Sequence, residues 1–140
     1  MSVLSAVQTY IKNYSGLATG APVWVNNLGV NPTEYGIVPL PGSRVVEWYL
    51  DKSSLREFSF AFELVNSTAD DVERLKSSDF FETFADWLES QTESEAFPTL
   101  GAKQTAYKIE ALGWGYLDQQ GESNTGIYLI QCKLTYQQSA

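Results

Sequence analysis

The segment from Leu55 to Val65 alternates between apolar and mixed side chains more regularly than any other part of the chain. Side chains of a β-strand point to opposite faces in turn, so this pattern predicts a strand with one apolar face. Because each buried side chain of this kind contributes roughly 1.5–3 kcal/mol, we expect that face to form the floor of the core beneath a helix. The apolar face carries Phe58, Phe60, Phe62 and Leu64.

Two predicted hairpins supply the rest of the sheet. Val45–Leu50 is rich in β-branched and aromatic residues, and the polar residues 51–54 join it to the alternating strand over the length of a hairpin turn. Two further strands are expected at 105–117 and 126–136, with a polar turn between them. Two glycines flank Trp114 in the first of these, which indicates a bulge or a close backbone approach.

Two segments show the spacing of helices. Apolar residues recur at helical intervals in Ser2–Tyr14. A second helical segment covers 68–92, begins with the capping-box spacing of Thr68 and Asp71, and is expected to break at Ser77–Ser78. Its second half carries an apolar stripe that should cover the phenylalanine face of the sheet. That stripe consists of Phe80, Phe81, Phe84, Trp87 and Leu88.

Together these elements predict an α+β fold in a single domain, residues 1–140. A mainly antiparallel sheet of about four strands, arranged as two hairpins, would pack against the N-terminal helix and the broken central helix. Residues 17–42 are rich in proline and glycine, which leaves room only for short extended pieces. Such a long, weakly patterned segment is typical of an arm or interface loop.

The sequence lacks the residue patterns that most enzymes need. It has no histidine, no serine nucleophile elbow, no glycine-rich phosphate loop and no Cys/His cluster. We interpret Asp86, Glu89, Glu93 and Glu95 as a solvated helix face running into an acidic loop, and Cys132 as a small strand side chain. We therefore expect no enzymatic activity, no cofactor and no metal site. Acid–base chemistry by carboxylates or tyrosine alone is the alternative.

The charge of the chain bears on nucleic-acid binding. A net charge of −8 argues against a DNA reader, because phosphate binding relies on clustered lysine and arginine, and the nine such residues are scattered. The same charge suits a protein past which DNA slides without sticking. No apolar stretch approaches the roughly 18–20 residues needed to span a bilayer, and no secretory signal pattern opens the sequence, so a soluble protein is expected.

Several motifs resemble those of a family of phage proteins usually labelled minor capsid or tail component. The run Val45–Phe62 resembles the family's tyrosine-acid-turn-serine hairpin and its following (Y/F)-x-F-A strand. Residues 79–89 resemble its helix, and Phe97–Leu100 its P-x-L connection. Tyr128–Tyr136 resembles its closing Y-x-I-Q-C-x-L-x-Y strand, the most specific piece. The hairpin turn departs from the family, since Asp51-Lys52-Ser53 stands where Asp-Gly-Ser is usual.

The resemblance implies a tail terminator of a long-tailed, non-contractile bacteriophage. Such proteins form a ring, commonly a hexamer, on the last ring of the tail tube, stop its polymerisation and offer the surface to which the DNA-filled head docks. The implied partners are copies of the chain itself, the major tail tube protein and the head–tail connector protein, while DNA passes through without specific binding. The implied location is the virion tail or neck, with assembly in the bacterial host cytoplasm and no membrane.

A ring needs heterologous contacts repeated around an axis, and exposed aromatic side chains can supply them. Phe60 and Trp87 are predicted to lie in the core instead. Two alternatives stay open: another head–tail neck or connector component, and a small domain that binds a hydrophobic ligand between sheet and helix. The predicted interface residues are Trp24, Trp48, Tyr49, Trp114 and Tyr128.

Overall fold

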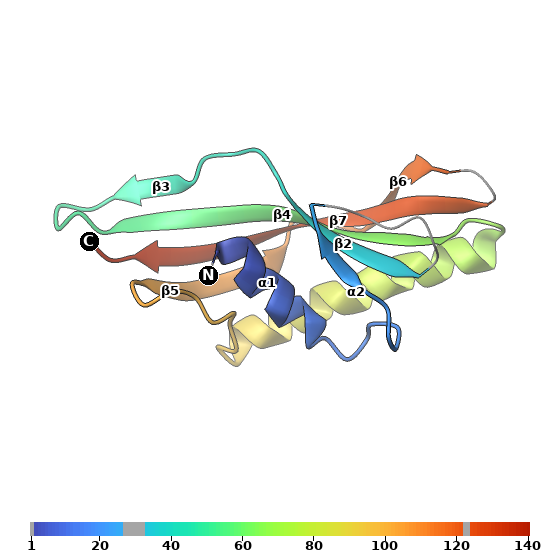
Figure 1. The fold of residues 1–140 in the computed structure, drawn as a ribbon, viewed down its shortest axis with the longest axis horizontal. Coiled ribbons are helices and arrows are strands. Elements are labelled where there is room, and N and C mark those ends of the chain that lie inside the picture. The colour runs from blue at the N-terminus through green and yellow to red at the C-terminus, as the bar shows by residue number, and fades with distance from the viewer. Residues whose placement is uncertain (1, 27–32, 122–123) are drawn as a thin grey trace.

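The computed structural model describes residues 2–26, 33–121 and 124–140, and within them the chain forms one mixed seven-stranded sheet and two helices (Figure 1). The strands lie in the order β1-β2-β4-β7-β5, with β3 on β4 and β6 on β7. All described strand pairs are antiparallel except β1 with β2. The elements are α1 (Val3–Lys12), β1 (Val23–Val25), β2 (Glu34–Pro39), β3 (Val45–Trp48), β4 (Ser54–Ser67), α2 (Asp71–Glu93), β5 (Gln104–Ala111), β6 (Tyr116–Gln120) and β7 (Thr125–Gln138).

The α+β class holds, but the predicted sheet of about four strands in two hairpins is wrong. The central strands β4 and β7 each have 14 residues, long enough for two shorter strands to pair end to end along each outer edge. Thus β3 and β2 share one edge of β4, while β5 and β6 share one edge of β7. The expected strand 105–117 is divided because residues 112–115 leave the sheet.

The apolar face of β4 packs into the core, as the alternation of its side chains predicts. Phe60, Phe62 and Leu64 are buried, and Phe58 is partly buried against Phe60 with ring centroids 5.7 Å apart. β4 pairs with β7 without a register shift from Ser54↔Gln138 to Ser67↔Thr125. This long, regular pair forms the centre of the sheet, and the other elements are arranged around it.

The central helix α2 is continuous, so the predicted break at Ser77–Ser78 is wrong. Ser77 is fully buried, and its hydroxyl accepts a hydrogen bond of 3.1 Å from the Asn66 side-chain amide of β4. A serine bonded to a neighbouring strand satisfies its hydroxyl without competing for the helix backbone. The helix also begins later than expected, because Asp70 rather than Thr68 is the N-cap and accepts from the Glu73 N–H.

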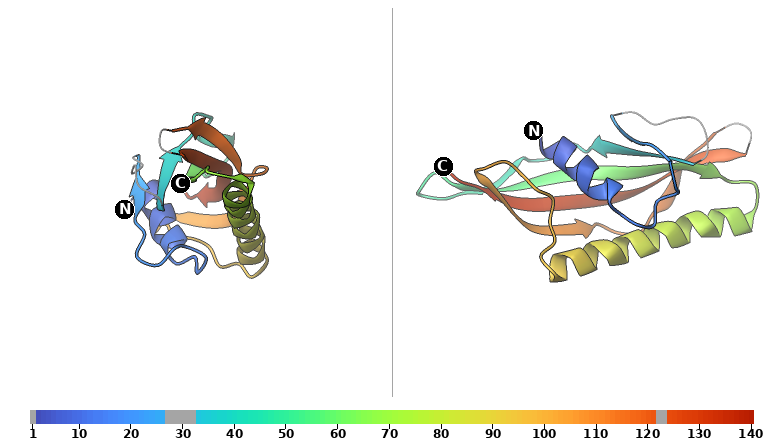
Figure 2. Two further views of the ribbon diagram at one scale, coloured as in Figure 1. Left: turned by 90° about the vertical axis from the view of Figure 1, so that its right-hand side faces the viewer. Right: turned by 60° about the horizontal axis from the view of Figure 1, so that its bottom comes forward.

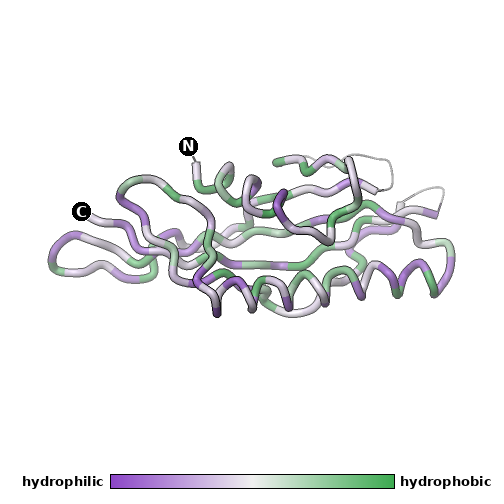
Figure 3. Tube along the Cα trace, turned by 90° about the horizontal axis from the view of Figure 1, so that it is seen from below, coloured by the Kyte–Doolittle hydropathy of each residue, from purple (hydrophilic) through white to green (hydrophobic). Residues whose placement is uncertain are grey.

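Both helices contribute to one core against the phenylalanine face (Figure 2). The rings of Phe62 on β4 and Phe84 on α2 have centroids 4.6 Å apart. Tyr14, just after α1, packs on Trp87 of α2 at 4.8 Å, which joins the two helices. Trp87 is partly buried and belongs to this core, as predicted. Apolar and polar residues alternate along α2 (Figure 3). Its buried residues are Ser77, Phe81, Phe84 and Leu88.

The molecule is elongated, and the β3–β4 hairpin (residues 43–57) reaches beyond both helices at one end (Figures 1 and 2). The N-terminal part of α2 and β6 lie at the other end. The segment 17–42, predicted as an arm or interface loop, contributes β1 and β2; its residues 27–32 lie outside the described part.

Candidate functional site

The β3–β4 hairpin ends in a turn that its own polar groups hold in place. The Tyr49 N–H donates to the Ser53 carbonyl at 2.9 Å, and the Lys52 N–H donates to the Tyr49 carbonyl at 3.0 Å. The Asp51 carboxylate accepts from both the hydroxyl and the N–H of Ser53. These bonds favour the ionised acid, so they lower the pKa of Asp51 below its ordinary value. The projecting end of the sheet is therefore an ordered structure.

Apolar side chains cover this turn and the strand before it. Trp48 is 63% exposed, and the guanidinium of Arg56 lies 5.6 Å from the centre of its ring. Leu50 is fully exposed at the tip. Apolar side chains that are clustered and exposed to water usually mark a surface that another molecule covers. The exposed apolar residues of the hairpin are Val46, Trp48, Tyr49 and Leu50.

A second exposed apolar surface lies between β5 and β6. Trp114 is 76% exposed there, while the neighbouring Gly115 lies directly against Phe81 of α2. Gly113 has a φ of 146°, a backbone angle that side chains other than glycine rarely adopt. The two glycines thus carry the backbone close to α2 and leave the indole pointing outward. The exposed apolar residues of this segment are Leu112, Trp114, Tyr116 and Leu117.

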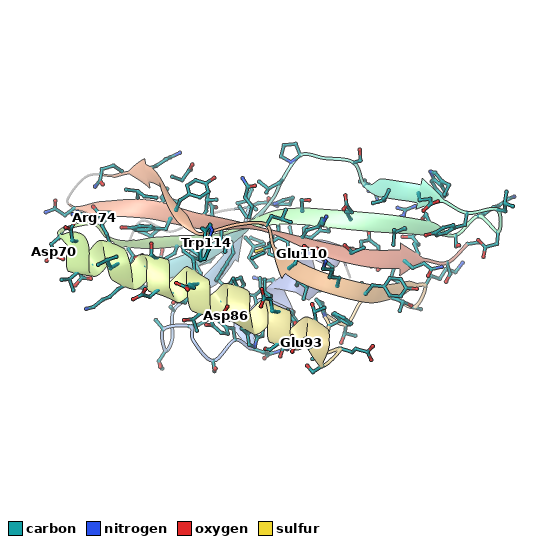
Figure 4. All side chains as sticks on the ribbon, turned by 180° about the vertical axis from the view of Figure 1, so that it is seen from behind. Asp70, Arg74, Asp86, Glu93, Glu110 and Trp114 are labelled. Carbon is teal, nitrogen blue, oxygen red and sulfur yellow. The ribbon has the colours of Figure 1, made fainter. Side chains whose placement is uncertain are left out.

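Trp114 borders a groove between α2 and β5, which we call the Trp114 groove (Figure 4). The groove has a volume of about 470 Å³. Thr92 links the two elements that form the groove, because its hydroxyl donates to the Ile109 carbonyl at 2.8 Å and accepts from the Ile109 N–H at 3.1 Å. The charged residues that line it are Glu82, Asp86, Glu89, Lys108 and Glu110. The groove is therefore acidic with one aromatic wall.

The five predicted interface aromatics do not form one surface. Trp48 and Tyr49 lie on the hairpin, Trp114 borders the groove, and Trp24 is 43% exposed on the edge strand β1. The prediction for Tyr128 is wrong, because this side chain is only 3% exposed and belongs to the core. Burial also raises the pKa of its phenol above the ordinary value.

Sequence reasoning missed Val46, Leu50 and the apolar neighbours of Trp114. The one signal for Leu50 was its place next to the polar turn 51–54, although Leu55 on the other side of that turn is partly buried. The exposure of Leu112 carried no such signal, because the exit of 112–115 from the sheet depends on the approach of Gly115 to Phe81. That contact joins residues far apart in the chain.

Other candidate groups lie away from these surfaces. Cys132 is completely buried in β7, and burial raises the pKa of its thiol far above the ordinary value, so it is a packed strand side chain. Among the described residues no group of three or more His, Cys, Asp or Glu side chains could hold a metal ion. Glu63 is half-buried on the sheet face opposite the helices, where burial and the nearby Asp118 raise its pKa.

No protein-family model matches the chain, and no curated protein matches it. In the described part of the chain, no helix is both long enough and apolar enough to cross a membrane.

Proposed function

We propose that this chain is a structural protein of a bacteriophage tail, a terminator that assembles as a ring on the end of the tail tube, stops its growth and forms the head-docking surface. The observation that carries the proposal is the pair of separate exposed apolar surfaces, on the β3–β4 hairpin and around Trp114. A subunit with two different exposed apolar surfaces can bind one identical neighbour through each of them. A ring requires such contacts on both sides of every subunit. The motif resemblance in Val45–Phe62 and Tyr128–Tyr136 supplies the phage context.

The packing between sheet and helix supports a structural role over the binding of a hydrophobic ligand. Phe62, Phe81 and Phe84 fill the space between β4 and α2, and each is fully buried. A ligand pocket needs an apolar cavity at that place. The net charge of −8 supports the passage of DNA. A protein of this charge repels phosphate.

The proposal is tested on purified protein in two steps. Light scattering over a concentration series should show a discrete species near six times the 15.6 kDa chain mass. The protein is then added to a growing tail tube of the same phage and the tube lengths are measured by electron microscopy. A terminator shortens the tubes as its ratio to tube protein rises, and it decorates one end only. Tubes of unchanged length with bare ends would contradict the proposal.

The second candidate, a neighbouring neck component, is distinguished in the same experiment. Such a protein would bind isolated connector rings but leave tube length unchanged. The same two apolar surfaces support a role as a neck component, because a protein that bridges two partners also needs two different contact surfaces. Binding to the bare tube end in the absence of any connector favours the terminator.

A further inference from the structure

The β3–β4 hairpin differs in charge from the rest of the molecule. Residues 43–57 contain three basic and three acidic side chains, whereas the remaining residues hold six basic and fourteen acidic ones. Of the hairpin acids, Glu57 is neutralised by Lys133 at 2.9 Å. Within the described residues, Arg44, Lys52 and Arg56 have no carboxylate at ion-pair distance. The hairpin therefore presents cations without carboxylate partners beside its exposed apolar side chains.

The Trp114 groove has the complementary arrangement. Glu110 pairs with Lys108 at 3.4 Å, but Glu82, Asp86 and Glu89 have no basic partner among the residues that the structure describes. These three carboxylates follow one side of α2 and face the ring of Trp114 across the groove. An aromatic ring next to carboxylates suits a ligand that carries both apolar and cationic groups. The β3–β4 hairpin carries both kinds of group.

The hairpin and the groove of one molecule cannot meet. Figure 4 places the hairpin at one end of the long axis and Trp114 near the middle, above α2, with the length of β5 between them. Any contact between the two surfaces must therefore join two copies. Copies with a net charge of −8 repel each other over most of their surface, and the neutral hairpin is the part that can approach an acidic groove at the lowest electrostatic cost.

We propose that the β3–β4 hairpin of one copy docks into the Trp114 groove of the next copy. Leu50 and Trp48 pack on Trp114, while the hairpin cations lie against Glu82, Asp86 and Glu89. The interface is heterologous, because a different surface is used on each side, and repetition of one such contact closes a ring or extends a filament. This inference rests on the proposed ring and names the surfaces that build it.

The test uses two variants and their mixture. Leu50→Asp disables the hairpin and Trp114→Asp disables the groove; both positions are exposed, so both variants should melt like the wild type by circular dichroism. We expect each variant alone to need at least about 10-fold more protein to assemble, as is usual when a central interface residue is removed. Leu75→Asp is the matched control, because Leu75 is 61% exposed on α2 and does not line the groove, and it should assemble normally.

The mixture decides whether the two surfaces are partners. An equal mixture of the two variants retains one intact hairpin and one intact groove, so it should form a two-chain complex of twice 15.6 kDa and nothing larger. Two monomeric variants that stay monomeric when mixed would overturn the proposal, because the surfaces would then not bind each other. Variants that assemble like the wild type would overturn it while leaving the ring intact. A wild type that is monomeric at every concentration and on tail tubes would overturn both proposals.

Discussion

Gly115 lies so close to Phe81 that a Cβ atom at position 115 would fall 2.5 Å from the phenylalanine side chain. Phe81 is fully buried in α2 and packs edge-on to Phe62, with ring centroids 6.2 Å apart, so it has no free space into which to move. This approach holds the 112–115 segment against α2 and turns Trp114 outward. A structural glycine thus sets the position of a candidate interface residue.

Gly115→Ala should therefore destabilise the fold and displace Trp114. Forcing a methyl group into a packed site costs about 1–3 kcal/mol. We expect a loss of that size in the free energy of unfolding, measured by urea denaturation, with a change in Trp fluorescence of the native protein. Gly101→Ala is the control, because its Cβ would meet only the flexible end of Gln104 at 3.2 Å, and it should change stability by less than about 0.5 kcal/mol. Equal losses for the two variants would contradict the close approach.

The parts of the fold that depend on local pattern could be read from the sequence. The alternation in β4 located Phe60 and Phe62 in the core, and the polar turn after Leu50 located the hairpin. The parallel pairing of β1 with β2 could not be read in this way, since Val23–Val25 is too short to show a period. The continuity of α2 at Ser77 depends on Asn66, a partner in another element.

Some features of the candidate site could likewise be predicted from the sequence, and others could not. Trp48, 63% exposed, was among the interface candidates that the sequence analysis selected. The burial of Tyr128 was also within reach, because it begins an alternation in β7 that continues through Ile130, Cys132 and Leu134, all buried. The Trp114 groove was not, because it forms only where α2 and β5 meet.

Phe60→Ala tests the placement of the core. Phe60 is fully buried at the centre of β4, opposite Cys132 of β7 and Pro39 of β2. Removing a buried aromatic ring leaves a cavity and costs about 3–5 kcal/mol. We expect the midpoint of urea unfolding to fall accordingly with an unchanged slope. Leu75→Ala removes an exposed apolar side chain and should cost less than about 0.5 kcal/mol, so similar losses would place Phe60 outside the core.

Lys52→Gly should stabilise the hairpin turn. Lys52 has a φ of 71°, which costs a residue with a Cβ roughly 1–2 kcal/mol relative to its preferred angles, whereas glycine adopts it freely. Part of this gain is offset by the greater freedom of glycine in the unfolded chain. We expect a net rise of up to about 1 kcal/mol in the free energy of unfolding. Asn124→Gly is the comparison at a φ of 57°, and it should gain less because asparagine tolerates this conformation; a loss at Lys52 would contradict the turn geometry.

Glu63→Gln should stabilise the protein at neutral pH but not in acid. Burial, together with the charge of Asp118 on β6, raises the pKa of Glu63 above its ordinary value of 4.5. The folded chain therefore holds the Glu63 proton more tightly than the unfolded chain does. The free energy of unfolding is therefore unaffected by the Glu63 charge below the pKa that Glu63 has in the unfolded chain. It falls as the pH rises towards the pKa of Glu63 in the folded chain, and it stays reduced at higher pH.

The glutamine removes this loss, because it carries no charge at any pH. We expect a gain of less than about 1 kcal/mol near pH 7, since solvent still reaches part of the side chain, and no gain below about pH 4. Urea unfolding of both proteins across this pH range measures the difference. Asp118→Asn removes the repulsion from the other partner and should give a smaller gain in the same window, because burial of Glu63 remains. A gain for Glu63→Gln of the same size at both ends of the range would mean that the amide acts through packing and that the carboxylate is not the cause.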